Sequence, residues 1–312
     1  MKPKRYYFLI NPSAASGKGY AIWKEVRQIF ELHSKFGEVY ILKRKGEATE
    51  IVQRITDQSI AEVHLIVLGG DGTLNEVLNG IVNFEDTVLS CIRTGSGNDF
   101  ATNVGIVKDV PKAVEHLINE PEEQVIDYGL IEYKTENEKK QRRFLISSGV
   151  GYDADICEEV EKSSLKKKLN KINWGKMVYL MIGIKQIFTR KSVAATIYMD
   201  DQEPMTIPEL FFVVGMIHEK EGGGVPFCPK ADATDGMLDV CLVRKMSKIK
   251  LLLAIMLVYV RKHYIFKNIT EHRCENLRVE LEQPQWFHMD GETSEKIYQM
   301  ELKCEHGLRF CK

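Results

Sequence analysis

Near-continuous apolar segments alternate with amphipathic ones over the first third of the chain, and this alternation is the strongest constraint on the fold. The apolar segments cover residues 6–11, 38–43, 63–69 and 87–93, and helix-forming segments separate them. Strands covered on both faces read as apolar runs, and strands joined through helices pair in parallel. The first third therefore predicts a doubly wound parallel sheet of the α/β class.

The pattern changes after about Asp127. Short apolar or alternating segments separated by turn residues now predict an antiparallel, strand-rich region. These segments cover residues 128–134, 142–151, 193–200, 209–216, 237–244 and 277–282, with helical stretches at 158–191 and 247–262.

A chain of 312 residues is long enough for two domains. We predict a nucleotide-binding α/β domain over residues 1–128 and a β-rich domain over residues 129–294. The segment from about 295 to 312 is expected to return to the first domain.

Composition excludes several classes of function. The chain has 43 Lys and Arg against 44 Asp and Glu, a balance that argues against nucleic-acid binding. Its seven Cys show no C-x-x-C pair or zinc-like spacing, and its start does not resemble a secretory signal, so we expect a reducing, cytoplasmic setting. The apolar run 251–260 is too short to cross a bilayer, which takes about 20 residues, and predicts a buried or interfacial helix.

The strongest local signal is the sequence GGDGTLN at 69–75, where an apolar strand ends and a helix begins. Open α/β sheets bind ligands at such points, and glycines let backbone N–H groups approach an anion closely. Asp71 would repel a phosphate unless Mg²⁺ lay between them. The alternative is an ordinary strand-to-helix turn in which Asp71 or Thr73 is the N-cap.

Two further polar turns end neighbouring strands. TGSGNDFA at 94–101 offers Ser96 and Asn98 as hydrogen-bonding partners for phosphate or ribose, and Asp99 as a metal ligand or a helix cap. NPSAASGKG at 11–19 ends the first strand with Asn11. Each turn alone is compatible with a capped loop, but together with GGDGT they predict a nucleotide site.

These motifs carry a family resemblance. NPSAASGKG, GGDGT and GSGNDFA resemble motifs of the diacylglycerol kinase catalytic-domain family, which includes soluble bacterial diacylglycerol kinases, related lipid kinases, and sphingosine and ceramide kinases. The resemblance continues through the second half in the same order. It is carried there by GVGYDA at 149–154, GGG at 222–224, PKADATDGMLDV at 229–240 and DGE at 290–292.

The resemblance implies a two-domain kinase that uses ATP and Mg²⁺. Its first domain would be similar to the nucleotide domain of phosphofructokinase and NAD kinase, and its second would be an antiparallel β-sandwich, with ATP between them. The matching positions assign ATP contacts to Asn11, Gly69, Gly70, Asp71, Gly72, Thr73, Leu74, Asn75, Ser96, Asn98 and Asp99. They assign the general base to Glu292, Mg²⁺ and water organisation to Asp71, Asp99 and Asp127, and a structural Mg²⁺ to Asp235 with Asp232 and Met237.

Phosphoryl transfer needs aligned phosphates, Mg²⁺ and a carboxylate beside the acceptor hydroxyl, in agreement with these assignments. Two positions depart from the family pattern. Met216 lies where many members carry an Asn before GGG, and residues 42–48 contain no hydroxyl side chain where members often have a Thr.

The expected reaction is transfer of the γ-phosphoryl group of ATP to a lipid hydroxyl, with diacylglycerol as the favoured acceptor. The alternatives are an NAD kinase-like enzyme, which shares the GGDG turn, and a nucleotide-sensing regulator without turnover. A Lys-rich stretch at 162–176, interleaved with aromatic and apolar residues, predicts peripheral contact with anionic lipid, although a solvated helix face fits it equally well. Because family members often dimerise, a homodimer is a further expectation.

Overall fold

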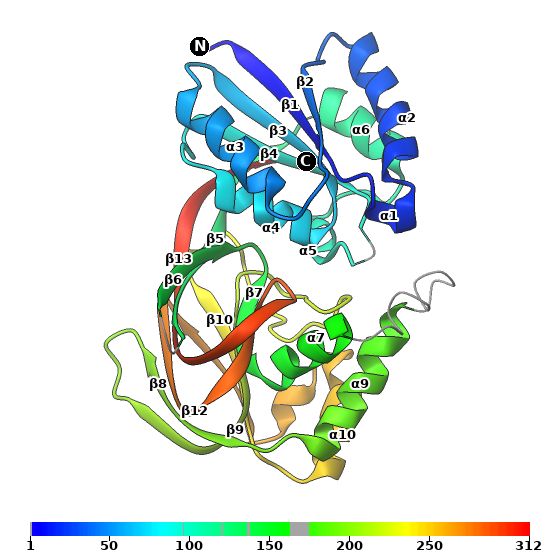
Figure 1. Ribbon diagram of the computed structural model, residues 1–312. Helices are drawn as coiled ribbons and strands as arrows, with labels where there is room; N and C mark the ends of the chain where they lie inside the picture. Colours follow the sequence, from blue (N-terminus) through cyan, green and yellow to red (C-terminus); the bar gives the residue numbers. More distant parts are fainter. Residues whose placement is uncertain (1, 96, 120, 136–137, 163–174) are drawn as a thin grey trace. The chain divides into compact units, whose positions relative to one another are not determined.

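The computed structural model describes residues 2–95, 97–119, 121–135, 138–162 and 175–312. The chain divides into two compact units, Met1–Asp127 with His306–Lys312, and Tyr128–Glu305 (Figure 1). The sequence-based division placed these boundaries at 128 and at about 294. The second boundary lies later because β13 (Glu292–Cys311) is one continuous strand whose last residues belong to the first unit.

The first unit contains a parallel sheet, as predicted, in the strand order β2–β1–β3–β4, with the end of β13 beside β4. Its strands are β1 (Lys4–Ile10), β2 (Glu38–Ile41), β3 (Glu62–Gly69) and β4 (Thr87–Arg93). Its helices are α1 (Ala14–Gly17), α2 (Gly19–Leu32), α3 (Glu47–Gln58), α4 (Asp71–Gly80), α5 (Asp99–Asn103) and α6 (Val110–Asn119).

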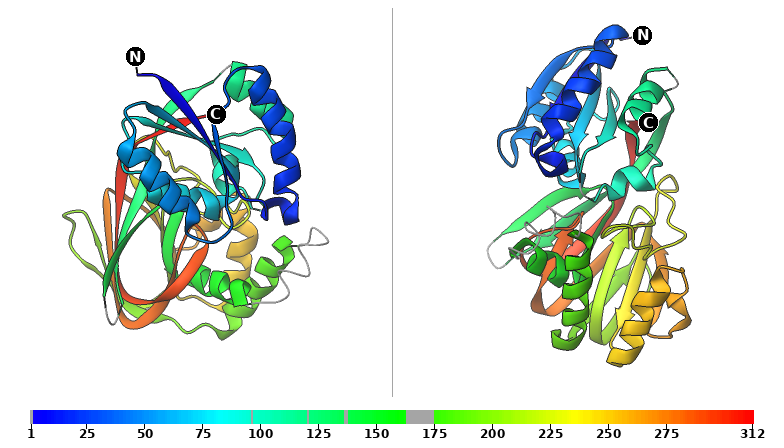
Figure 2. Two further views of the ribbon diagram at one scale, coloured as in Figure 1. Left: turned by 45° about the horizontal axis from the view of Figure 1, so that its top comes forward. Right: turned by 90° about the vertical axis from the view of Figure 1, so that its right-hand side faces the viewer.

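Helices cover both faces of this sheet (Figure 2). Phe8 and Ile66 point to the face on which α2 and α6 pack, where they join Trp23 and Val26 of α2 and Val114 of α6 in one buried cluster. α3 packs against α4 on the other face. This arrangement explains why the strands read as continuous apolar runs rather than alternating ones.

The second unit is antiparallel, also as predicted. Its strands are β5 (Glu123–Lys134), which begins in the first unit, β6 (Lys139–Phe144), β7 (Ser147–Gly151), β8 (Val193–Met199), β9 (Met205–Met216), β10 (Leu238–Arg244), β11 (Ile269–Cys274), β12 (Asn276–Met289) and the larger part of β13. Both β7 and β8 pair with β9 and with β12, so these four strands close into a ring. The ring encloses a core that includes Val150, Val213, Leu277 and Phe287.

The helices of the second unit cover the outer side of β9. They are α7 (Tyr152–Lys162), α9 (Gly175–Thr189), α10 (Lys248–Val258) and the short 3₁₀ helix η1 (His263–Ile265). Phe212 and Val214 alternate with Val213 along β9 and pack in a second cluster with Leu251 and Ala254 of α10. Of the predicted basic stretch 162–176, the positions 163–174 lie outside the described residues.

One predicted strand, 142–151, is two strands. β6 ends at Phe144 and β7 begins at Ser147, because the amides of Leu145, Ile146 and Ser147 bond to the carboxylate of Asp290. All seven cysteines are free and six of them are buried, as expected for small core side chains.

Candidate active site

The first glycine-rich turn joins β3 to α4. Its tightness requires glycine at position 69, because a Cβ there would lie 2.5 Å from the Cβ of Thr73. The Thr73 hydroxyl accepts a hydrogen bond of 3.0 Å from Nδ2 of Asn11, the residue that follows β1. This contact ties the polar turns after two neighbouring strands to each other.

The second glycine-rich turn, after β4, lies directly against the first. A Cβ on Gly95 would lie 2.5 Å from the Cα of Gly70, and a Cβ on Gly70 would lie 3.1 Å from the Cα of Gly95. Only glycine at both positions lets the two backbones approach this closely. The prediction that these turns lie together at one sheet edge is therefore confirmed for Gly70 and Gly95.

Asp71 fastens the second turn to the first. Its Oδ2 accepts a hydrogen bond from the amide of Asp99, and its Oδ1 accepts one from the amide of Phe100, both at 3.1 Å. Asp71 thus supplies the N-terminal cap of α5 from another helix. Burial raises the pKa of the Asp71 carboxyl, and the backbone hydrogen bonds oppose that rise.

Asn98 closes the second turn on itself. The residue has a positive φ of 55°, which Asn tolerates better than most residues. Its Oδ1 accepts from the Gly95 amide at 2.8 Å, and its Nδ2 donates to the Gly95 carbonyl at 2.6 Å. Its side chain therefore shapes the turn, while Asp99 begins α5 and is partly exposed. Ser96 lies outside the described residues.

Two of the predicted nucleotide contacts, Leu74 and Asn75, have buried side chains. Leu74 is 2% exposed. The backbone carbonyl and Oδ1 of Asn75 both accept hydrogen bonds from Asn79. Gly72 lies in the first turn of α4, where helix amides have no partner within the helix.

Asp127, on β5, is fully buried and its Oδ1 lies 2.6 Å from Nδ1 of His306. The His306 side chain is about half-exposed. Sequence reasoning missed this partner, because 179 residues separate the two positions and no motif contains His306.

The Asp-Gly-Glu motif forms the tight hairpin turn between β12 and β13. Asp290 and Gly291 both have positive φ, at 48° and 78°, and Met289 pairs with Glu292 across the turn. This is the two-residue hairpin that Asp-Gly favours. Glu292 is thereby held at the first position of β13, where it is partly exposed.

Asp290 anchors this hairpin. Its carboxylate accepts hydrogen bonds from the amides of Leu145 at 2.9 Å, Ile146 at 2.7 Å and Ser147 at 3.2 Å. Each residue of the motif therefore has its own role. Asp290 anchors the hairpin, Gly291 completes its tight turn, and Glu292 supplies a partly exposed carboxylate.

A buried acid–histidine cluster lies at the same end of β12. Nε2 of His288 is 3.0 Å from Oδ2 of Asp153, and ligand atoms of Asp153, Glu221 and His288 lie within 4.8 Å of one another. Ser147 donates its hydroxyl hydrogen bond to Glu221. Burial alone lowers the pKa of His288, but the Asp153 and Glu221 carboxylates more than reverse this, so its pKa rises to about 9.

The free energy of unfolding is expected to fall as the pH rises from about 6.5 to about 9. The pKa of His288 is raised from 6.5 to about 9, so protonation stabilises the fold. This contribution is complete below pH 6.5 and is lost as the pH passes the folded-state pKa, on the order of 3 kcal/mol in all. Denaturant unfolding between pH 6 and 9.5 measures it. The variant His288→Gln should show a flatter profile in this window, and an equally steep one would contradict the assignment.

Sequence reasoning missed this cluster, although Asp153 lies in the GVGYDA motif. Among the described residues, it is the one group of three or more Asp, Glu, Cys or His side chains close enough to hold a metal ion. Nδ1 of His288 lies 3.4 Å from the Gly291 amide, at the long limit for a hydrogen bond, so the contact with Asp153 orients the ring.

The predicted structural metal site has a different environment. The Asp235 carboxylate forms an ion pair with Arg273, and its Oδ1 accepts from the Met237 amide at 3.1 Å. Oδ1 of Asp232 accepts from the amide and the hydroxyl of Thr234. A guanidinium group therefore supplies the positive charge beside Asp235.

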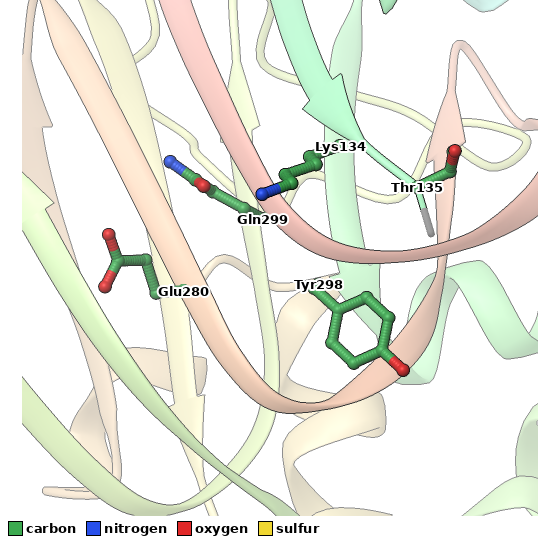
Figure 3. Close-up of a pocket in the computed structure, with 5 residues that line it drawn as sticks. All are labelled: Lys134, Thr135, Glu280, Tyr298 and Gln299. Carbon is green, nitrogen blue, oxygen red and sulfur yellow. The ribbon is translucent and has the colours of Figure 1, made fainter. Parts of the chain in front are cut away.

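An open pocket of about 440 Å³ lies beside strands of the second unit (Figure 3). It is lined by Lys134, Thr135, Glu280, Tyr298 and Gln299, from the end of β5 and from β12 and β13. None of the predicted site residues lines it.

Comparison with known proteins agrees with the motifs. Residues 5–131 match the family model described as the diacylglycerol kinase catalytic domain, and residues 146–303 match the YegS C-terminal NAD kinase beta sandwich-like domain. The putative lipid kinase YtlR of Bacillus subtilis is 24% identical over 289 residues, covering 92% of this chain and 93% of that protein. The diacylglycerol kinase of the same organism is 24% identical over 296 residues, covering 93% and 90%.

A solved structure of a putative diacylglycerol kinase from Bacillus anthracis has the same fold, with a TM-score of 0.78 at 21% identity, over 99% of this chain and 95% of that one. The chain belongs to the diacylglycerol kinase catalytic-domain family and is a lipid kinase. Among the helices that the structure describes, none has both the length and the apolar character needed to span a bilayer.

Proposed function

We propose that the protein transfers the γ-phosphoryl group of ATP to a lipid hydroxyl with the help of Mg²⁺, and that diacylglycerol is the acceptor. The observation that carries this proposal is the joining of three polar turns at the carboxyl ends of β1, β3 and β4. Asn11 binds Thr73, Gly70 touches Gly95, and Asp71 caps α5. Such an edge of a parallel sheet suits a nucleotide phosphate chain.

The residues of the first unit fit a Mg²⁺–nucleotide. Mg²⁺ prefers oxygen ligands and is commonly held by one or two carboxylates together with substrate phosphates. Asp71 and Asp99 supply carboxylates at the joined turns, and the Asp71 carboxylate also accepts the amide hydrogen bonds that join these turns. When bound, Mg²⁺ would neutralise charge on the phosphates. The backbone amides of the glycine-rich turns would hold the phosphate chain in line.

Glu292 is our candidate for the general base. It would accept the proton of the lipid hydroxyl as the phosphoryl group is transferred. The hairpin anchored by Asp290 supports this role, because a base must be held within hydrogen-bond reach of its proton. The substrate would be a lipid presented at a membrane surface, and a homodimer remains part of the proposal.

The test is transfer of labelled phosphate from γ-labelled ATP in mixed micelles. Separate reactions contain diacylglycerol, monoacylglycerol, a prenol or sphingosine, and each is repeated with EDTA. We expect labelled phosphatidic acid from diacylglycerol, and no transfer once Mg²⁺ is chelated. Transfer to another lipid would keep the mechanism and replace the acceptor.

Two outcomes would overturn the proposal. Phosphorylation of NAD, with no lipid product, would favour an NAD kinase-like enzyme. ATP binding by calorimetry without transfer to any acceptor would favour a nucleotide-sensing regulator of the same fold.

A further inference from the structure

Two neighbouring helices of the second unit expose an unusual number of large apolar side chains. We call this surface the α9/α10 face and define it by Leu180, Met181, Ile184 and Phe188 of α9, Ile249, Leu253 and Met256 of α10, and Tyr259, Val260 and Ile265, which follow α10. Ile249 is 73% exposed and Met256 is 71% exposed. Single exposed apolar residues are ordinary, but a contiguous group of this kind marks an interaction site.

After its first turn, which carries Lys248 and Lys250, the α10 helix is apolar around its whole circumference. Leu251 and Ala254 are buried against β9, Val258 is also buried, and Leu253 and Met256 are exposed. A helix with no polar face is normally buried or in contact with lipid. The α2 helix of the same chain has the usual pattern: Trp23, Val26 and Phe30 are buried, and its exposed positions include Lys24, Glu25, Arg27 and Gln28.

The exposed side chains of the two helices form one surface. α9 contacts α10, and the end of α9 meets the start of α10 (Figure 1). Nζ of Lys248 donates to the carbonyl of Phe188 at 3.1 Å and lies 5.1 Å from the centre of the Phe188 ring.

The segments that carry this face are basic, and three of their bases, Lys185, Lys245 and Arg261, form ion pairs with glutamates of other segments. No Asp or Glu occurs in residues 175–199 or 240–270, in a chain whose acidic and basic residues are almost equal in number. Exposed bases lie beside the apolar residues at Lys248, Lys250 and Lys262. An apolar surface with a basic border complements an anionic lipid bilayer, which attracts Lys and Arg and accepts apolar side chains at its interface.

We propose that the α9/α10 face docks the protein on anionic phospholipid membranes. The proposal rests on the proposed function, because a lipid kinase must reach an acceptor that lies in a bilayer. A second copy of the chain is the less suitable occupant, because a two-fold contact through this face would bring two basic borders together. The bilayer removes the apolar residues from water and supplies the opposite charge.

Docking brings the enzyme to its lipid substrate but takes no part in phosphoryl transfer. The face lies entirely on helices of the second unit, and none of its residues is among the candidate site residues. Losing it should therefore reduce phosphorylation of lipids held in vesicles, and leave intact the phosphorylation of a short-chain lipid dispersed as monomers.

The experiment is co-sedimentation with sucrose-loaded vesicles, made either of phosphatidylcholine alone or of phosphatidylcholine with phosphatidylglycerol. The wild-type chain should bind the anionic vesicles and bind them more weakly in high salt. The double variant Leu253→Asp/Met256→Asp should bind at least tenfold more weakly, and so should Lys250→Glu/Lys262→Glu. All four positions are exposed, so both variants should keep the wild-type melting temperature.

The matched control is Ile60→Asp, which places the same charge at an isoleucine that is 84% exposed in the first unit. It should bind vesicles like the wild type. Unchanged binding by both double variants would overturn the proposal. A change from dimer to monomer in the variants, with vesicle binding unchanged, would overturn it in favour of a protein interface. Absence of kinase activity with vesicle binding intact would instead count against the proposed function alone.

Discussion

The variant Glu292→Gln should lower kcat for lipid phosphorylation by about 100- to 10,000-fold, the range typical for loss of a general base. The substitution keeps the size and shape of the side chain and removes its negative charge and its ability to take a proton. Glu292 is partly exposed at the start of β13, so the fold should be unaffected. Labelled phosphate transfer gives kcat, calorimetry gives ATP affinity and thermal unfolding gives stability.

Only kcat should change. A matched control is Glu301→Gln, because Glu301 is an exposed glutamate on the same strand, outside the candidate site. It should behave like the wild type in all three measurements. Near-normal turnover by Glu292→Gln would remove Glu292 from the proposed mechanism, and the acceptor proton would then need another carboxylate.

The fold of the first unit was largely readable from the sequence. Apolar runs such as 63–69 are buried on both faces, and only parallel strands between helix layers produce that pattern. The second unit was readable as antiparallel, but β11 was not predicted and β13 was expected only as a returning segment. In β13 many polar and charged residues lie between the apolar ones, so the sequence pattern does not indicate one long strand. The split between β6 and β7 depends on Asp290, which lies far along the chain, and local pattern cannot reveal it.

The candidate site, too, was predictable only in part from the sequence. Glycine-rich turns after strands are recognisable locally, and Gly70 and Gly95 do meet. The hydrogen bonds of individual side chains could not be predicted, because they depend on partners elsewhere in the sequence. The bonds of Asn98 to Gly95 were not predicted, and neither was the use of both Asp71 oxygens on the amides of α5.

Pairings across long sequence separations were missed altogether. Asp127 with His306 and Asp153 with His288 join residues that no motif contains together. Their common feature is a buried carboxylate beside an imidazole, which satisfies a charge that burial would otherwise make costly. A sequence shows that such a carboxylate exists and gives no sign of the partner that stabilises it.

Asp290→Ala should destabilise the second unit by about 3 to 5 kcal/mol and abolish lipid phosphorylation. The carboxylate serves three amides, and the backbone of Leu145, Ile146 and Ser147 lies among buried residues, so these amides would lose strong, charge-assisted hydrogen bonds. Alanine also tolerates the positive φ of this position less well than Asp. Denaturant unfolding gives the free energy, and faster hydrogen exchange at residues 145–147 would locate the damage.

The conservative variant Asp290→Asn separates the two causes. Asparagine keeps the tolerance for positive φ and one carbonyl oxygen, which can still accept from Ile146 and Ser147, but its NH₂ group would face the Leu145 amide. It should lose less stability than Asp290→Ala and recover part of the activity. Because Glu292→Gln loses turnover at full stability, the two positions should separate base chemistry from the placement of the base. Full stability and normal exchange in Asp290→Ala would show that the hairpin holds Glu292 without its anchor.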